Sequence, residues 1–307
     1  MTTIGQAYRW HRPLMAFAGA MAILAVVATV GVFVDDRTLV GVPIWTKPLK
    51  FAISFVVYGV ALAWMLSLLR RGRRVGWWTG LVITVASVIE MVIVVGQVVR
   101  GRQSHFNAAT PLDATLFAVM GATILVLWLA NVLVAVLLLR DRVADPALTW
   151  ALRLGALIMI GGLSVGLLMV QPTADQQRAM NAGAAPTLVG AHSVGVPDGG
   201  PSMPLTGWST TGGDLRIPHF LGIHALQLLP LLVLALRRFP PPAQLRLVFV
   251  AAGTYAGMVG LVLWQALRSQ PLLHPDGLTL GALAGLLAVA GTAAVLVTRR
   301  GAVPAVA

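Results

Sequence analysis

Glu90 is an acidic residue inside a long apolar stretch of the chain. If that stretch crosses a bilayer as a helix, Glu90 lies ~15 Å from Arg100 at its end, near the middle of the membrane. A carboxylate there costs ~2.5–3.5 kcal/mol on insertion scales, so such residues usually face the bundle interior and often serve function. Gln97 follows on nearly the same helical face. We therefore expect a polar track that leads outward from Glu90; the alternative is a protonated Glu90 that hydrogen-bonds between helices.

His224 is the second ionisable residue of this kind, about two helical turns into another apolar stretch, with Gln227 on the same face. An imidazole at that depth could ligate a haem or a metal ion, accept a proton or hydrogen-bond a substrate. The alternative is a histidine satisfied by a neighbouring helix. His219 is about 140° around the helix from His224, so the two do not form a same-face metal-binding pair.

Basic side chains precede or follow the apolar stretches near these positions. Guanidinium and ammonium groups bind carboxylates and phosphates, so we expect Lys47, Lys50, Arg100 and Arg216 to hold an anionic group. His105, in a dense polar run after Arg100, would serve as a loop-borne acid, base or ligand. The alternatives are lysines that anchor a helix at the membrane interface and a loop that is simply solvated.

These residue types predict proton transfer or cofactor ligation beside an anion-binding group. The residues expected to carry the chemistry are Glu90, His105 and His224. Those expected to bind a cofactor or substrate are His219, His224, Arg100, Arg216, Lys47, Lys50, Gln97, Gln227 and Trp208. The candidate metal ligands are His105, His219 and His224, and the cofactor stays open between a haem and a divalent metal ion.

Eight apolar stretches must position these side chains. They cover residues 14–34, 51–69, 75–99, 114–139, 154–174, 217–236, 247–267 and 277–298. Each reaches or approaches the ~20 residues that a membrane-spanning helix needs. With 58% hydrophobic and only 10% charged residues, the chain has too few charges to solvate a water-soluble surface of its size. The sequence therefore predicts an all-α polytopic membrane helix bundle, with residues 1–307 as one membrane domain.

Arginines predict the orientation of this bundle. With a cytoplasmic N-terminus, every inner connection carries at least two of them: Arg9, Arg12, Arg70, Arg71, Arg73, Arg74, Arg140, Arg142, Arg153, Arg237, Arg238, Arg246, Arg299 and Arg300. This is the positive-inside pattern, so both termini should lie in the cytoplasm and the histidine-rich connections outside. The net charge of +12 is scattered over these helix ends and forms no basic stripe, which argues against nucleic acid as a partner.

Two helix ends in the chain look alike. One carries Gln97, Arg100, His105 and Asp113, and the other carries Gln265, Arg268, His274 and Asp276. Matching elements four stretches apart predict a four-plus-four duplication, with halves 1–149 and 150–307 that share one orientation. The alternative is that helix ends converge on similar polar caps.

Residues 171–216 form the longest connection and place Trp208 among many glycines and prolines. A loop of this length is usually a lid, a binding loop or a disordered segment. A disordered segment would contain more charge and fewer large apolar residues. We expect an ordered extracytoplasmic cap, beneath which Glu90 and His224 face one cavity.

Three blocks of the chain resemble an uncharacterised family of bacterial polytopic membrane proteins: residues 45–54, 104–113 and 196–220. The resemblance implies a location in the bacterial cytoplasmic membrane but brings no activity with it. The four-plus-four plan is more weakly similar to the haem A synthase class, in which paired histidines on even-numbered helices hold haems. Here His224 stands at such a position, but its repeat mate is Ser54. This departure argues against a haem held by two histidines.

The sequence favours a membrane-embedded enzyme or redox protein that works at the outer leaflet. Its substrate or cofactor would be a lipidic or anionic small molecule, such as a quinone, an isoprenoid, a lipid or haem. One alternative is a structural or binding subunit of a larger membrane complex. The other is a proton-coupled transporter that uses Glu90, against which the apolar inner halves of the stretches argue.

Overall fold

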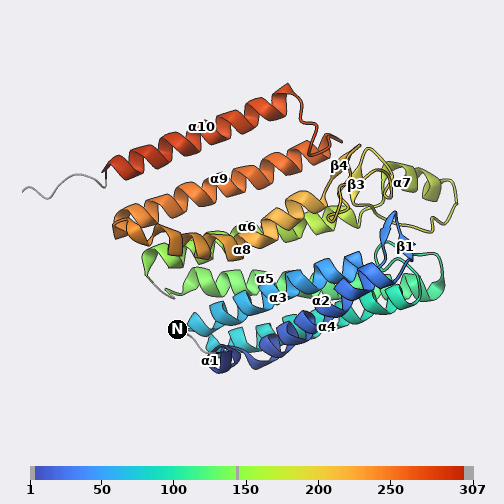
Figure 1. The fold of residues 1–307 in the computed structure, drawn as a ribbon, viewed down its shortest axis with the longest axis horizontal. Coiled ribbons are helices and arrows are strands. Elements are labelled where there is room, and N and C mark those ends of the chain that lie inside the picture. The colour runs from blue at the N-terminus through green and yellow to red at the C-terminus, as the bar shows by residue number, and fades with distance from the viewer. Residues whose placement is uncertain (1–3, 143–144, 301–307) are drawn as a thin grey trace, which may run out of the picture.

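The computed structural model describes residues 4–142 and 145–300 and is an all-α bundle with two short β-hairpins (Figure 1). The helices are α1 (Ile4–Tyr8), α2 (Arg12–Val34), α3 (Thr46–Leu68), α4 (Arg73–Val99), α5 (Pro111–Arg140), α6 (Pro146–Met169), α7 (Ala174–Asn181), α8 (Arg216–Ala235), the 3-10 turn η1 (Leu236–Arg238), α9 (Pro241–Leu267) and α10 (Gly277–Arg300). The strands are β1 (Thr38–Leu39), β2 (Val42–Pro43), β3 (Ser193–Val194) and β4 (Gly213–Asp214). Eight helices of the described chain are long and apolar enough to cross a bilayer, which confirms the multi-pass architecture.

Capping signals fix where several helices begin. Thr110 Oγ1 accepts a hydrogen bond from Asp113 N at 3.1 Å at the start of α5, and an Asp145 carboxylate oxygen accepts one from Leu148 N at 3.0 Å at the start of α6. Each cap is followed by a proline, whose missing N–H costs nothing in a first turn. The Asp145 cap explains why α6 begins eight residues before the apolar stretch predicted from residue 154.

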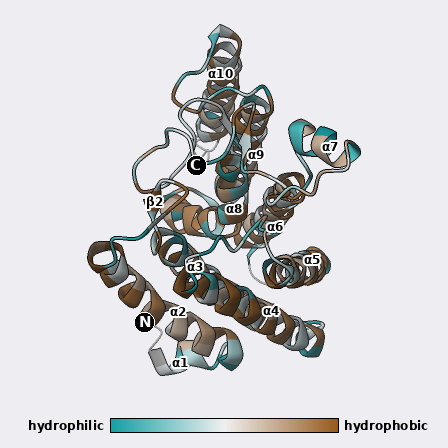
Figure 2. Cartoon of the chain, turned by 90° about the vertical axis from the view of Figure 1, so that its right-hand side faces the viewer, coloured by the Kyte–Doolittle hydropathy of each residue, from teal (hydrophilic) through white to brown (hydrophobic). Residues whose placement is uncertain are grey.

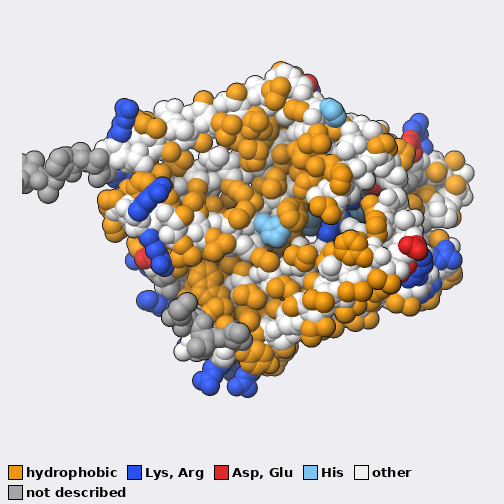
Figure 3. Space-filling model, viewed as in Figure 1, with side chains coloured by type: hydrophobic (Ala, Val, Ile, Leu, Met, Phe, Trp, Pro, Cys, Tyr) orange, Lys and Arg blue, Asp and Glu red, His pale blue; other side chains and the backbone are white. Residues whose placement is uncertain are grey.

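The spanning helices lie side by side, with the strands and α7 gathered at one end of the bundle, here called the cap end (Figure 1). Seen from that end, the spanning helices are largely brown, the hydrophobic colour, and α7 is partly teal (Figure 2). Large apolar side chains of these helices are exposed, among them Ile23, Val92 and Leu231. The opposite end carries blue Lys and Arg side chains (Figure 3). This distribution gives the bundle an apolar belt between two polar ends, which is the arrangement that a bilayer stabilises.

The first and second halves of the chain pack in the same pattern. In the first half α2 contacts α3 and α4, α3 contacts α4, and α4 contacts α5. In the second half α6 contacts α8 and α9, α8 contacts α9, and α9 contacts α10. The predicted duplication agrees with this pattern but stays a prediction, because helices of similar order can pack alike without common ancestry.

Each half is also closed at the cap end by a similar polar clasp. In the first, Arg100 Nη1 donates to Asp113 Oδ1 at 2.7 Å, and Gln97 Nε2 donates to the carbonyl of Gln103 at 3.1 Å. Gln97 Nε2 also donates to the Asp113 carboxylate, whose side chain is fully buried. Gln97 and Arg100 therefore tie α4 to α5, and their predicted contact with a substrate or cofactor stays a prediction.

In the second clasp Arg268 pairs with Asp276 at the start of α10, and Gln265 Nε2 donates to the carbonyl of Pro271 at 2.7 Å. The arginine lies at the end of one helix in both clasps, the carboxylate lies at the start of the next helix, and the glutamine holds the intervening turn. Positive charge at a helix C-terminus and negative charge at an N-terminus are both favourable. The clasps thus stabilise two tight helix connections.

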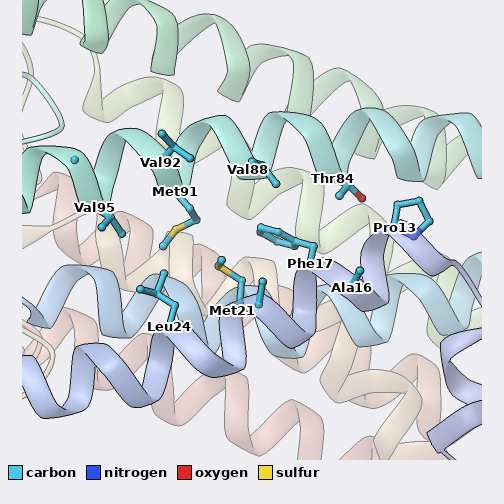
Figure 4. Close-up of a pocket in the computed structure, with 12 residues that line it drawn as sticks. Pro13, Ala16, Phe17, Met21, Leu24, Thr84, Val88, Met91, Val92 and Val95 are labelled. Carbon is cyan, nitrogen blue, oxygen red and sulfur yellow. The ribbon is translucent and has the colours of Figure 1, made fainter.

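An apolar groove of about 720 Å³ runs between α2 and α4. Figure 4 shows Phe17 and Met21 of α2 and Met91 of α4 pointing toward one another in it, and Thr84 is a polar residue at its edge. It contains none of the candidate site residues. We interpret it as part of the lipid-facing surface.

The helices α6 and α8 make the most extensive contact in the described chain, and glycines bring their backbones together. A Cβ added at Gly162 would lie 2.6 Å from the Cα of Gly222, so no larger residue fits at this crossing. Gly161 is its neighbour in sequence, but a Cβ there would meet nothing within 4 Å.

The substitution Gly162→Ala should lower the stability of the protein by about 2 kcal/mol, because it overpacks the α6–α8 crossing. The matched variant Gly161→Ala carries the same gain in helix propensity without the clash. Thermal unfolding of both variants in detergent should give a clearly lower midpoint for Gly162→Ala. Equal midpoints would show that α6 and α8 are not packed this closely.

Candidate functional site

The connection between α6 and α8, here called the cap, folds over the cap end of the bundle, and its extracytoplasmic position stays a prediction. It contains a helix, α7, and the hairpin β3–β4, neither of which we predicted. Backbone hydrogen bonds join it to the α4–α5 loop, from Val189 N to Phe106 O at 2.9 Å and from Ala108 N to Thr187 O at 2.8 Å. The cap of the second half thereby holds a loop of the first half against the helices.

Below this junction, a chain of two side-chain contacts joins Lys47 to His105 and His105 to Glu90. Lys47 Nζ lies 2.9 Å from His105 Nδ1, and His105 Nε2 lies 3.4 Å from Glu90 Oε1. An ammonium group can only donate, so His105 Nδ1 accepts and the ring proton is on Nε2, which faces Glu90. A cation, an imidazole and a carboxyl group are thus arranged in sequence for proton transfer.

Glu90 is fully buried, and neither of its carboxylate oxygens has a hydrogen-bond partner in the described chain. The 3.4 Å contact with His105 is within ion-pair range but lacks the geometry of a hydrogen bond. Ser87, one turn below on α4, is also buried, and its hydroxyl oxygen is likewise unpartnered. Buried polar groups are nearly always satisfied, so these two mark a place built for a proton, a water molecule or a ligand.

A strained residue aims His105 at this line. Phe106 adopts φ of 63°, a left-handed conformation that is rare for a bulky side chain. Its ring is buried against Val165 and Met169, and its carbonyl accepts the bond from the cap. The burial of this ring therefore offsets the backbone strain at Phe106, whose turn directs the side chain of His105 inward.

His192 and Asp198 form a second acid–base pair, within the cap itself. Asp198 Oδ2 accepts from His192 Nδ1 at 2.7 Å, and Asp198 also accepts the backbone N–H groups of His192 and Ser193. These bonds fix the proton on Nδ1, so Nε2 carries the free lone pair. The two side chains are 25% and 20% exposed, which leaves this nitrogen open to a reactant.

Three cations meet beside these pairs. The charges of Lys50 and Arg216 both act on Lys47, which places the three within electrostatic range of one another. Arg216 pairs with the buried Asp214 at 2.5 Å, whereas no carboxylate of the described chain forms an ion pair with Lys47 or Lys50. Asp198 and Glu90 also act electrostatically on Lys47, but neither forms an ion pair with it, so Lys47 and Lys50 are the cations left to bind an anion.

We call Lys47, Lys50, His105, His192, Asp198 and Arg216 the cap cluster, with Glu90 at its base. Its members come from α3, the α4–α5 loop, the cap and the first turn of α8. The electrostatic influence of Lys47, His192 and His219 on His105 confirms that these groups are neighbours. The structure thus brings together Lys47, Lys50, Arg216, His105 and Glu90 from the predicted site.

His219 and His224 are placed differently. His219 Nδ1 donates to the carbonyl of Gly162 at 2.8 Å, which leaves its Nε2 free near the cluster. His224 packs its ring 4.4 Å from that of Phe220, which in turn contacts Trp208 at 5.9 Å. Its Nε2 is buried without a hydrogen-bond partner.

The expectation that Glu90 and His224 face one cavity stays a prediction, because the contacts of the two side chains differ. Glu90 meets His105 and Lys47, whereas no charged partner of His224 was found in the described chain apart from the nearby imidazole of His219. Gln227 lies beneath His224, where its amide group reaches the carbonyls of Ile223 and His224 when its O and N positions are exchanged. The two residues therefore belong to separate groups on opposite halves of the bundle.

The residues of this region do not form an assembled metal centre. Among residues 4–142 and 145–300, no group of three or more His, Asp or Glu side chains is positioned to hold a metal ion. The candidate ligands His105, His219 and His224 each contact a different partner. A haem or a divalent metal ion therefore stays untested as a cofactor, and no step below depends on one.

Two parts of the site escaped prediction. The pairing of His192 with Asp198 occurs within an irregular loop, where spacing has no periodic meaning. Ser87 lies one turn from Glu90 on α4, and this i, i+3 spacing could have identified it.

Comparisons with protein-family models, with curated proteins and with solved structures gave no match for the chain.

Burial lowers the pKa of His105 well below its usual value, and the positive charges of Lys47, His192 and His219 lower it further. Burial also lowers the pKa of His192, more than its bond to Asp198 raises it. For Asp198, burial raises the pKa, but the hydrogen bonds from His192 and Ser193 outweigh it and hold the pKa below its usual range. At neutral pH the cluster therefore holds neutral imidazoles and an ionised Asp198.

A histidine whose pKa is lowered by folding binds a proton more readily in the unfolded chain, so stability is lost as the pH falls below about 6.5. The thermal midpoint should therefore be lower at pH 5.5 than at pH 7.5. Replacing both histidines, in His105→Gln with His192→Gln, should reduce this difference. A pH dependence that the double variant leaves unchanged would contradict the assignment.

Proposed function

We propose that the protein is a membrane-embedded enzyme that performs acid–base chemistry on an amphiphile with an anionic headgroup. The observation that carries the proposal is the line from Lys47 through His105 to Glu90, which ends in a fully buried carboxyl group without a hydrogen-bond partner. Burying an ionisable group in this state is expensive, and proteins do so mainly at functional sites.

Each part of the cap cluster has a role in this proposal. Lys47, Lys50 and Arg216 hold the anionic headgroup, which is a phosphate or a carboxylate by the chemistry of its partners. His192, oriented by Asp198, is the general base, because its Nε2 is free and its pKa keeps it neutral. His105 and Glu90 supply or receive the second proton.

The amphiphilic nature of the substrate follows from where the cluster lies. Lys47 and Lys50 belong to the first turns of the spanning helix α3, and Arg216 begins the spanning helix α8. Figure 3 shows a hollow on the lipid-facing side near the cap end, where basic side chains and a histidine come to the surface among apolar ones. A molecule that moves within the leaflet could reach the cluster through this hollow.

The positive-inside pattern supports an extracytoplasmic position for the cap end. The opposite end holds the arginines of the α3–α4 and α5–α6 connections, where Asp141 accepts the backbone N–H groups of Arg70 at 2.5 Å and Arg71 at 2.8 Å. The enzyme would then work at the outer leaflet of a bacterial cytoplasmic membrane, as expected from the sequence.

Glu90→Gln should remove the protonatable group while keeping its shape, so turnover should fall about a hundredfold with little loss of lipid binding. Lys47→Met should weaken binding of an anionic lipid about tenfold, through the loss of one charge-assisted interaction. The measurements are native mass spectrometry for bound phosphatidylglycerol and mass spectrometry of extracted lipids for turnover, with the protein in nanodiscs of host lipid.

Arg102→Gln is the matched control, because it removes an exposed cation at the same end of the bundle but outside the cluster. It should bind lipid and turn it over as the parent protein does. If Lys47→Met and Arg102→Gln bind phosphatidylglycerol equally well, the cap cluster is not the headgroup site and the proposal fails.

A further inference from the structure

Residues 203–208 of the cap form a tight turn with an unusual apolar tip. Met203 N donates to Trp208 O at 2.8 Å, and Gly207 N donates to Met203 O at 2.9 Å. At the tip Leu205 has a φ of 65° and is 88% exposed. A leucine in the left-handed region that buries almost nothing within its own chain gains no packing to offset its strain.

This turn bridges the two halves of the bundle. From α3 in the first half, Lys50 Nζ donates to Thr206 O at 2.8 Å. From α8 in the second half, Arg216 Nη2 donates to Gly207 O at 2.6 Å, and Trp208 contacts the ring of Phe220. The helices α3 and α8 touch directly over only a short stretch, and the turn adds a bridge between their cap ends.

A phosphate could replace the backbone carbonyls as the acceptors of the hydrogen bonds from Lys50 and Arg216. Both cations donate to neutral backbone carbonyls, and charged oxygens of a phosphate bind such donors about twice as strongly. Lys50 has no carboxylate ion-pair partner in the described chain that would compete, and Arg216 keeps its pairing with Asp214 whether or not Gly207 is present. The carbonyls of Thr206 and Gly207 thus occupy positions that headgroup oxygens would take.

The location of Leu205 indicates what surrounds the tip. A Cβ on Gly207 would lie 3.7 Å from Val42 and 3.9 Å from Lys50 Nζ, so the turn rests against the first turns of α3 and the β1–β2 hairpin. This is the level at which α3 enters the bilayer. An apolar side chain exposed beside the start of a candidate span is suited to contact with the lipid of the interface, which would supply the burial that the protein does not.

We propose that residues 203–208 are a lateral gate for an anionic lipid. The headgroup displaces the carbonyls of Thr206 and Gly207 from Lys50 and Arg216, and the turn swings away, which changes the contact of Leu205 with lipid. The gate rests on the proposed function, since it names the route by which the amphiphile reaches the cap cluster. Phe220, which is 43% exposed, and His224 border the path of the lipid tail.

The absence of cysteine from the sequence makes the gate accessible to a single label. Leu205→Cys would carry an environment-sensitive nitrobenzoxadiazole group, and Met180→Cys, exposed on α7, would carry the control label. Each protein would be placed in nanodiscs of phosphatidylcholine, with and without phosphatidylglycerol, and a further sample in phosphatidylcholine would receive inorganic phosphate. The readouts are quenching by doxyl-labelled lipid and by aqueous iodide.

The gate predicts that the label at residue 205 is quenched by doxyl lipid in phosphatidylcholine, and that phosphatidylglycerol changes this quenching while the control label does not respond. Lys50→Met should raise the phosphatidylglycerol fraction required about tenfold, and Arg102→Gln should not. Gly207→Ala, which strains a residue at φ of 65°, should shift the turn about fivefold toward the open state.

The other outcomes separate the two proposals. A label that doxyl lipid never quenches, or that responds to inorganic phosphate as it does to phosphatidylglycerol, overturns the lateral gate. If phosphatidylglycerol binds in a Lys50-dependent way by native mass spectrometry while the label stays unchanged, the gate is wrong and the proposed function stands. If no such binding occurs, both are wrong.

Discussion

Inside a bilayer every polar group must find its partner within the protein, because hydrocarbon offers none. The structure meets this requirement with bonds within and between helices, such as that from the Tyr58 hydroxyl of α3 to Asn131 Oδ1 of α5 at 2.7 Å. The buried side chains of the described residues that do not meet it are Ser87, Glu90 and His224. Glu90 lies at the base of the cap cluster, so the proposed chemistry would take place where a buried polar group has no partner.

The constraint also explains which features could be predicted from sequence. Eight spans follow from the length of apolar stretches, and the depth of Glu90 follows from its distance to a helix end. The part that Arg100 and Gln97 play in closing a helix connection was not predicted, because composition alone cannot tell a substrate cation from one that joins two helices. Thr110 and Asp113 in the sequence mark the start of α5, and the Asp113 carboxylate is the partner that Arg100 and Gln97 bind.

The rest of the site depends on how each helix is rotated about its own axis and on the path of the loops, and neither could be deduced from the sequence. Glu90 and His224 lie within membrane spans, but which neighbours they face is decided by how α4 and α8 are turned within their halves. The pairing of His192 with Asp198, and the approach of Arg216 to Lys50, arise from an irregular cap whose path has no period. Such contacts emerge only when the two halves are packed together.

The glycine crossing of α6 and α8 has a consequence for proton placement. Gly162 offers its carbonyl to His219 because the two backbones approach so closely that no side chain intervenes. That bond assigns the ring hydrogen of His219 to Nδ1 and leaves Nε2 as a lone pair beside His105 and His192. The spacing between two helices therefore sets the tautomer of an imidazole, and any motion that separates the helices would release it.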